Sequence, residues 1–250
     1  MLAVAALGVT GALAQRVAAP VWTAMQAREP ARRPESATAA AGRGVTLALL
    51  GGFRSLVADA LWIELHLVWE KRNLPAADTL VRLVPAIDPR PTYFWLNGAR
   101  IMAYDFPVWR IRAAGGYARV AAEEQDRLQQ EQARAALGLL ETARAFHPAS
   151  AELWIERANL ELNRLRDPAA AAESYRRAAA CPDAPFYAAR LHAEILRRLG
   201  RKTEALAWLT RLHPALPRGN EAAAADLVLE RIRDLEAQLA VPAGQRYPPR

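Results

Sequence analysis

The residue types that carry most enzyme and metal chemistry are few and scattered in this chain. The four histidines are His66, His147, His192 and His213. His66 has Glu70 one helical turn away, and a single His/Glu pair supplies too few ligands for a zinc site. No glycine-rich phosphate loop follows a strand-like segment, and no Gly-x-Ser-x-Gly motif occurs. The sequence therefore predicts no catalytic residue, no metal site and no cofactor, and we expect a protein that is not an enzyme.

The single cysteine, Cys181, fits the same conclusion. It precedes Pro182 at the end of an alanine-rich stretch and has no base nearby in the sequence. One thiol forms neither an internal disulfide nor a thiolate metal cluster. We interpret it as a structural thiol.

Composition favours an all-helical protein. Apolar residues make up 52% of the 250 residues, so a sizeable core is available. Alanine, leucine and arginine dominate, and these are good helix formers. Alternating β-branched runs bounded by turn residues, which are typical of strands, are absent.

The net charge of +7 raises the question of an anionic partner. The arginines, however, alternate with glutamates along the predicted helices, as in the run of Glu156, Arg157, Glu161 and Arg164. We interpret such runs as solvated helix faces with ion pairs one turn apart. Nucleic-acid binding is therefore kept only as a minor alternative, since repeated base-reading residue pairs are also missing.

A regular spacing of prolines organises most of the chain. Pro148 and Pro182 are 34 residues apart, Pro217 lies 35 residues further, and Pro89 closes a similar unit upstream. Twelve residues before these prolines stand four alanines: Ala77, Ala136, Ala170 and Ala205. Six residues after Pro89 stands Trp95, and six residues after Pro148 stands Trp154. A small residue lets two helices cross closely, and the residue before a proline is pushed out of the helical conformation. The pattern predicts repeated helix pairs.

These offsets resemble the tetratricopeptide repeat (TPR) family, which has a tryptophan early in helix A, a small residue at the helix crossing and a closing proline. The resemblance covers about residues 58–219 and implies an all-α fold. It implies an α-solenoid of antiparallel helix pairs (a TPR-like superhelix), with a capping helix over Asn220–Leu239 at the C-terminal end.

The predicted units are 58–91, 92–116, 117–150, 151–185 and 186–219. The second helices are expected at Ala76–Pro85, Ala133–His147, Pro168–Ala180 and Thr203–His213, with Gly200 in the turn of the last unit. We expect Asp105 to Pro107 and Gly115-Gly116 to break up the short second unit. In the fourth unit a one-residue insertion is expected near Arg166 to Pro168.

The resemblance also implies which residues line the concave surface, because helix A faces the groove in this family. The corresponding positions are Trp62, His66, Trp69, Tyr93, Arg100, Tyr104, Asn159, Asn163, Arg190, Glu194 and Arg197. Aromatic residues and arginine dominate binding energy at interfaces, and Arg100 and Arg190 have the geometry to hold carboxylates. Trp62 and Trp69 are seven residues apart, so an alternative role for this stripe is core packing. Trp62 also stands where some family members have a carboxylate-binding lysine, so that specificity is not expected here.

The N-terminal region indicates export or tethering. Residues Leu2 to Ala14 form an apolar run that would span about 20 Å, short of a ~30 Å hydrocarbon core, and Ala12-Leu13-Ala14 is a small-x-small cleavage pattern. We predict a signal peptide or membrane anchor at 1–26, a linker at 27–44, the repeat domain at 45–240 and a flexible tail at 241–250. The segment from Gly51 to Glu64 resembles the opening of a helical-repeat protein type of planctomycete- and verrucomicrobium-like bacteria, which implies membrane association.

Together these features predict an interaction scaffold of the cell envelope, either tethered to the inner membrane or periplasmic, that binds a protein or peptide. A cytoplasmic location is the alternative. A second reading is a subunit of a membrane assembly, in which the apolar helix expected at 45–69 packs on an integral partner. Near Val45 to Gly52 its apolar residues run nearly all round the helix.

Overall fold

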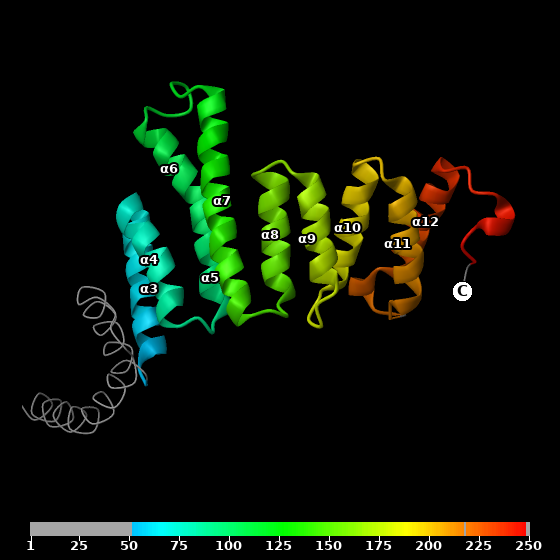
Figure 1. Ribbon diagram of the computed structural model, residues 1–250, viewed down its shortest axis with the longest axis horizontal. Helices are drawn as coiled ribbons and strands as arrows, with labels where there is room; N and C mark the ends of the chain where they lie inside the picture. Colours follow the sequence, from blue (N-terminus) through cyan, green and yellow to red (C-terminus); the bar gives the residue numbers. More distant parts are fainter. Residues whose placement is uncertain (1–51, 218, 249–250) are drawn as a thin grey trace, which may run out of the picture. The chain divides into compact units, whose positions relative to one another are not determined.

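All regular elements in the described part of the chain are helices. The computed structural model describes residues 52–217 and 219–248 (Figure 1). Successive helices lie side by side in a row, and each packs mainly on its neighbours in sequence. This part of the chain is therefore an α-solenoid of antiparallel helix pairs, as predicted. None of its helices is both long enough and apolar enough to cross a membrane. The predictions for 1–26, 27–44 and the start of the 45–69 helix lie outside the described residues.

The first pair consists of α3 (Arg54–Glu70) and α4 (Leu74–Ile87). The Asn73 side chain accepts a hydrogen bond from the Ala76 backbone N–H and so caps α4. Pro75 occupies the first turn of α4, where its missing N–H costs nothing.

The second pair corrects the predicted unit boundaries. The segments predicted as separate units at 92–116 and 117–150 form one long pair. Its first arm comprises α5 (Thr92–Arg100), the π-helix η1 (Ile101–Asp105) and α6 (Phe106–Ala113), and its second arm is α7 (Ala122–Phe146). α6 and the adjoining part of α7 extend beyond the row of other helices in Figure 1.

The expected break before Pro107 does not occur because the helix widens there. The Phe106 N–H donates to the Ile101 carbonyl, five residues back, as in a π-turn. Pro107 then falls in the first turn of α6, where a missing N–H is tolerated. Gly115 and Gly116 do end the arm, with φ of +106° and +87°.

Two shorter pairs follow the long one. They are α8 (Ala151–Asn163) with α9 (Pro168–Ala179), and α10 (Phe186–Arg198) with α11 (Lys202–Leu212). Gly200 has φ of +77° between α10 and α11, and the Arg201 N–H donates to the Leu196 carbonyl at 2.9 Å. This is the predicted glycine-terminated turn.

Small residues lie where the paired helices cross. Ala77, Ala136 and Ala205 are fully buried, as the repeat pattern predicts. Ala170 is only partly buried, and its neighbour Ala171 is fully buried instead. The crossing of the third pair is therefore displaced by one residue, consistent with the insertion expected just before it.

The C-terminal end of the solenoid is covered as predicted. Helix α12 (Ala225–Gln238) buries Val228, Ile232 and Leu235 against the core of the last two pairs. Tyr247, in the segment predicted as a flexible tail, contacts His213 through its hydroxyl at 3.0 Å and donates its backbone N–H to Glu236. This part of the tail is packed against the domain.

Candidate functional site

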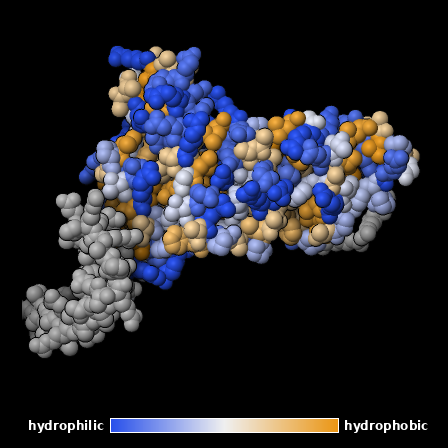
Figure 2. All heavy atoms as spheres, in the orientation of Figure 1, coloured by the Kyte–Doolittle hydropathy of each residue, from blue (hydrophilic) through white to orange (hydrophobic). Residues whose placement is uncertain are grey.

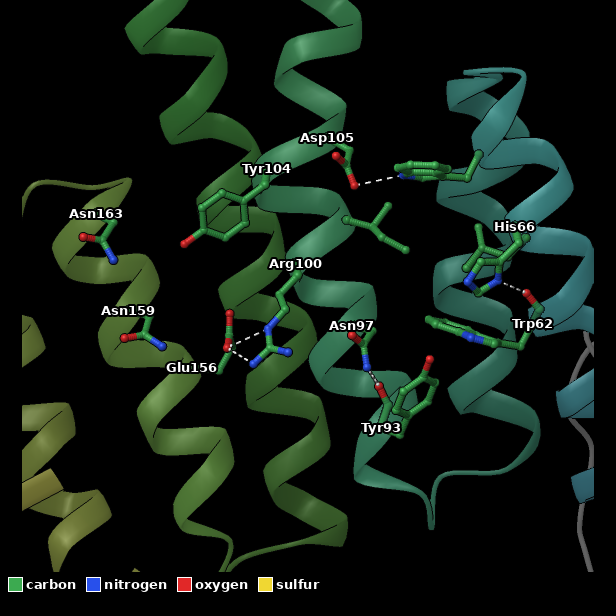
Figure 3. A pocket seen from close by; sticks show the side chains of 13 residues that line it. Trp62, His66, Tyr93, Asn97, Arg100, Tyr104, Asp105, Glu156, Asn159 and Asn163 are labelled. Carbon is green, nitrogen blue, oxygen red and sulfur yellow. Dashed lines mark hydrogen bonds and ion pairs between the residues drawn. The ribbon is translucent and has the colours of Figure 1, made fainter. Parts of the chain in front are cut away.

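A cleft of about 710 Å³ lies between the first helices of the first three pairs: α3, α5 with η1, and α8 (Figure 3). Eight of the eleven residues predicted for the concave surface line it: Trp62, His66, Trp69, Tyr93, Arg100, Tyr104, Asn159 and Asn163. Residues that are about 100 positions apart in the sequence are thus brought to one surface.

Aromatic side chains form the α3 side of the cleft. Trp62 is 8% exposed and packs on Phe94 and Tyr93, with ring centroids 5.2 and 5.5 Å away. Trp69 is 39% exposed, and its Nε1 donates to Asp105 at 2.9 Å. The stripe was expected either to line the groove or to pack in the core. Trp62 does both, whereas Trp69 lines the cleft and is partly open to solvent.

Trp62 leaves a buried donor without a partner. Its Nε1 has no hydrogen-bond acceptor among the described residues. The indole groups of Trp69, Trp95 and Trp208 all donate to an oxygen at 2.9 Å. An unsatisfied buried donor is unfavourable, so the Trp62 Nε1 is a weak point in the hydrogen bonding of the described residues. Figure 3 shows the Trp62 ring pointing toward the cleft.

An ion pair crosses the floor of the cleft from α5 to α8. Arg100 donates through Nε at 2.9 Å and through Nη2 at 2.6 Å to the same oxygen of Glu156. The Glu156 side chain is 4% exposed and that of Arg100 is 52% exposed. This hydrogen bonding raises the pKa of Arg100 above its ordinary value, so the guanidinium stays charged.

The prediction that the glutamates of α8 form a solvated face is wrong for two of them. Glu156 and Glu161 are each 3% exposed. Glu161 accepts from Arg157 at 2.8 Å and from the Ser174 hydroxyl at 2.6 Å. These glutamates face neighbouring helices that supply donors, and helical spacing alone does not show this.

Amide side chains supply further hydrogen-bonding groups. The Asn97 amide donates to the Tyr93 carbonyl at 2.9 Å, and Asn159 accepts from the Tyr175 hydroxyl at 2.6 Å. Burial raises the pKa of Tyr175 to about 12, so it remains a donor. The Asn97 Oδ1 and the Asn159 Nδ2 have no partner within the described residues, and the exposed Asn163 side chain has none there either.

The other two predicted residues of the first cleft, Tyr104 and His66, are held by contacts within the chain. The Arg164 guanidinium lies over the Tyr104 ring at 4.1 Å. The His66 Nδ1 lies 2.8 Å from the Trp62 carbonyl, and the two rings are 5.6 Å apart. These contacts fix the orientation of side chains at the two sides of the cleft.

The first cleft has no excess of positive charge, although the chain as a whole carries a net charge of +7. Figure 2 shows hydrophilic and hydrophobic residues interspersed on one face of the molecule. The cleft lining contains one guanidinium, Arg100, and two carboxylates, Asp105 and Glu156. Each of these carboxylates already accepts a hydrogen bond from inside the cleft. This surface therefore lacks the unpaired positive charge that a phosphate backbone requires.

The cleft continues along the solenoid. A second cleft of about 440 Å³ shares Tyr93, Asn97, Arg100 and Glu156 with the first and reaches Tyr187 on α10. A third, of about 470 Å³, is also lined by Tyr187 and lies between α10, α11 and α12. We call the surface formed by these three clefts the inner groove.

The three predicted residues on α10 are separated from the first cleft. Arg190 and Glu194 line the third cleft, and Arg197 lines none of the three. The Arg190 Nη1 donates to the carbonyls of Ala222 and Ala223 at 2.9 and 2.8 Å. Glu194 is paired with Arg197 at 2.7 Å and with Arg198 at 2.9 Å. Hydrogen bonds from these arginines lower the pKa of Glu194 to about 2.

Arg100 and Arg190 were expected to bind a carboxylate of a ligand, but both are already engaged within the chain. Arg100 holds a carboxylate of its own chain, and Arg190 holds backbone carbonyls. Both arginines shape the inner groove by fixing the elements around it.

Sequence reasoning missed five residues of the first cleft: Leu65, Asn97, Ile101, Asp105 and Glu156. Asn97 could have been predicted from the sequence, because it lies between Tyr93 and Arg100 on the same helical stripe. Asp105 and Glu156 could not, since each is defined by a donor on another helix.

The described residues contain no cluster of three or more His, Cys, Asp or Glu side chains able to hold a metal ion. Cys181 contacts the Arg177 carbonyl at 3.4 Å, and burial raises the pKa of its thiol. A raised pKa is the opposite of what an activated nucleophile needs. The first cleft is thus a surface of aromatic, amide and paired charged groups.

No family model and no curated protein matches the chain. Among solved structures, the chain is similar to a thermophilic TPR protein in Thermus thermophilus, with a TM-score of 0.40 and 19% identity over 74% of this chain and 82% of that one.

Proposed function

We propose that this protein is a non-catalytic interaction scaffold that binds an extended segment of a protein partner, or a peptide, in the inner groove. The observation that carries the proposal is the run of three clefts, with lining residues shared between neighbouring clefts, that extends from α3 to α12. A groove of this form suits a chain that lies across several helix pairs better than a compact small molecule.

The chemistry of the groove supports a polypeptide ligand. Tyr93 is 53% and Tyr187 is 44% exposed, so their rings are available for contact. Such residues give large contact area at low entropic cost. The amide groups of Asn97, Asn159 and Asn163 match the donors and acceptors of a peptide backbone. The paired charges of the first cleft disfavour nucleic acid there, and it remains the weaker candidate.

Site-specific photocrosslinking in the host tests this proposal. A photoreactive phenylalanine analogue replaces Tyr93 or Tyr187 in the groove, and Tyr117 serves as the control because it is 48% exposed outside the three clefts. We expect protein adducts at the two groove positions and not at Tyr117. Equal labelling of the same proteins at Tyr117, or adducts that nuclease removes, would contradict peptide binding in the groove.

The proposal includes a location in the cell envelope, supported by the apolar run from Leu2 to Ala14 and its small-x-small ending. Host fractionation followed by intact-mass measurement tests it. Membrane recovery with this run retained indicates a tether, and an extracytoplasmic form that begins at Gln15 indicates a cleaved signal peptide. A cytosolic form with the run intact would rule out export.

A further inference from the structure

Helix α3 is apolar on two opposite faces. Its inner face buries Ala58, Trp62 and Leu65 in the core of the first two pairs. On the other side, Leu56 and Ile63 are each 64% exposed and Leu67 is 55% exposed. Among the described elements, α3 packs chiefly on α4, which covers only one side of it.

The exposed residues follow the spacing of a coiled-coil seam. Leu56, Ala60, Ile63 and Leu67 are separated by four, three and four positions. This alternation keeps one stripe of a helix facing a partner helix over three turns. We call these four residues the α3 seam.

The last described α-helix, α12, shows that this kind of exposure is not shared by both outermost α-helices of the described part. Its exposed positions include Asp226, Glu230, Asp234 and Gln238, and Leu227 is the one large apolar residue exposed on it. A polar outer face is what a solenoid end in contact with water requires. The α3 seam has the composition of an end that is covered.

We infer that the α3 seam pairs with the α3 seam of a second copy of this chain, in antiparallel orientation. About a twofold axis between Ala60 and Ile63, the small Ala60 lies opposite the large Ile63 of the partner subunit. Leu56 lies opposite Leu67 of the partner subunit. Because of the twofold axis, each of these two side-chain contacts occurs twice in the interface. The seam is therefore complementary to itself, as an isologous interface must be.

The flanking charges select the orientation. In a parallel pair, Asp59 would face Glu64 of the partner subunit across the seam, which places like charges together. In the antiparallel pair, Asp59 instead faces His66 of the partner subunit. Removal of a like-charge contact discriminates between the two arrangements. This inference does not depend on the ligand of the inner groove.

Sedimentation of the full chain tests the pairing. We expect a dimer, and we expect Ile63→Arg to raise its dissociation constant by roughly 30-fold or more, the effect of losing a central interface residue. Leu83→Arg is the matched control, because Leu83 is a 41% exposed apolar residue on α4. Far-UV circular dichroism checks that both variants are folded. A monomeric wild-type chain, or a dimer that survives Ile63→Arg, would overturn the inference.

Disulfide trapping tests the orientation. In a Cys181→Ser background, Ala60→Cys and Ile63→Cys chains are mixed under mild oxidation. Antiparallel pairing predicts that the mixed disulfide forms faster than either symmetric one, since only opposed positions approach bonding distance. Faster Ala60→Cys self-linkage would overturn antiparallel pairing. Monomers that bind lipid vesicles through Ile63 would assign the seam to a membrane instead.

Discussion

Replacement of Arg100 by methionine tests whether the ion pair on the floor of the inner groove holds α5 to α8. The substitution keeps an extended apolar stem and removes the guanidinium that donates twice to Glu156. The Glu156 carboxylate is then left 4% exposed without its charged partner. We expect this stranded carboxylate, rather than the lost contact itself, to dominate the free-energy change.

The magnitude follows from the exposure of the two partners. Removing one partner of a fully buried pair costs about 3–5 kcal/mol, whereas an exposed pair contributes about 0–1 kcal/mol. Since Arg100 is 52% exposed and Glu156 is 4% exposed, an intermediate loss of about 2 kcal/mol is expected. For a domain of this size that loss lowers the Tm by about 4–8 °C. Arg82→Met, which breaks a pair exposed on both sides (50% and 38%), should cost no more than about 0.5 kcal/mol.

Urea unfolding followed by circular dichroism and tryptophan fluorescence measures these values. The cycle is completed with Glu156→Met and the Arg100→Met/Glu156→Met double variant. We expect the double variant to be more stable than the sum of the single losses predicts, by about 1–2 kcal/mol, because it leaves no buried charge. If Arg100→Met costs no more than Arg82→Met, the ion pair does not hold these helices together.

Two further predictions concern the pH dependence and the packing of the solenoid. Burial lowers the pKa of His192 below the ordinary value of 6.5, although the Ala172 carbonyl opposes this shift. As the pH falls, the unfolded chain therefore takes up the proton first, so the stability is highest above pH 6.5 and decreases below that value. His192→Phe should lose less urea resistance between pH 7.5 and pH 5.5 than the wild type. Equal losses in the two proteins would contradict this reasoning. Gly138→Ala adds a Cβ that meets nothing within 4 Å inside α7 and should stabilise the protein by about 0.5–1 kcal/mol. In Gly98→Ala the same atom meets side chains of α4 and α7 at 3.1 and 3.3 Å, so thermal unfolding should show no such gain, and an equal rise in Tm would mean that the crossing is not tightly packed.

The repeat architecture was predictable because its determinants are local. The glycine at 200 acts within one turn of its own helix, and the alanines at the crossings can be found by their fixed spacing from the closing prolines. The error in the second pair arose from the same local rules. A proline usually ends a helix, and here the π-turn at η1 absorbs Pro107 without ending the arm.

The groove shows how far helical spacing reaches. The resemblance to the repeat family implied Tyr93, Arg100 and Tyr104 as groove residues, and the structure places all three in the lining of the first cleft. Helical spacing did not identify Glu156 as buried, because burial depends on the facing helix. The same limit applied to Arg190, whose backbone acceptors lie more than thirty residues further along the chain.

The sequence by itself determined the helix pairs, the C-terminal cap and the absence of catalytic motifs, since these follow from composition and from spacing along the chain. Most residues of the first cleft were implied by the resemblance to the repeat family. The tertiary structure alone decided how the groups interact. It joined units 92–116 and 117–150 into one pair, paired Arg100 with Glu156 across the groove and left the Trp62 Nε1 without an acceptor among the described residues. The physical reason is that hydrogen bonds and burial between helices depend on which residues face each other, and periodicity within one helix carries no information on its partner.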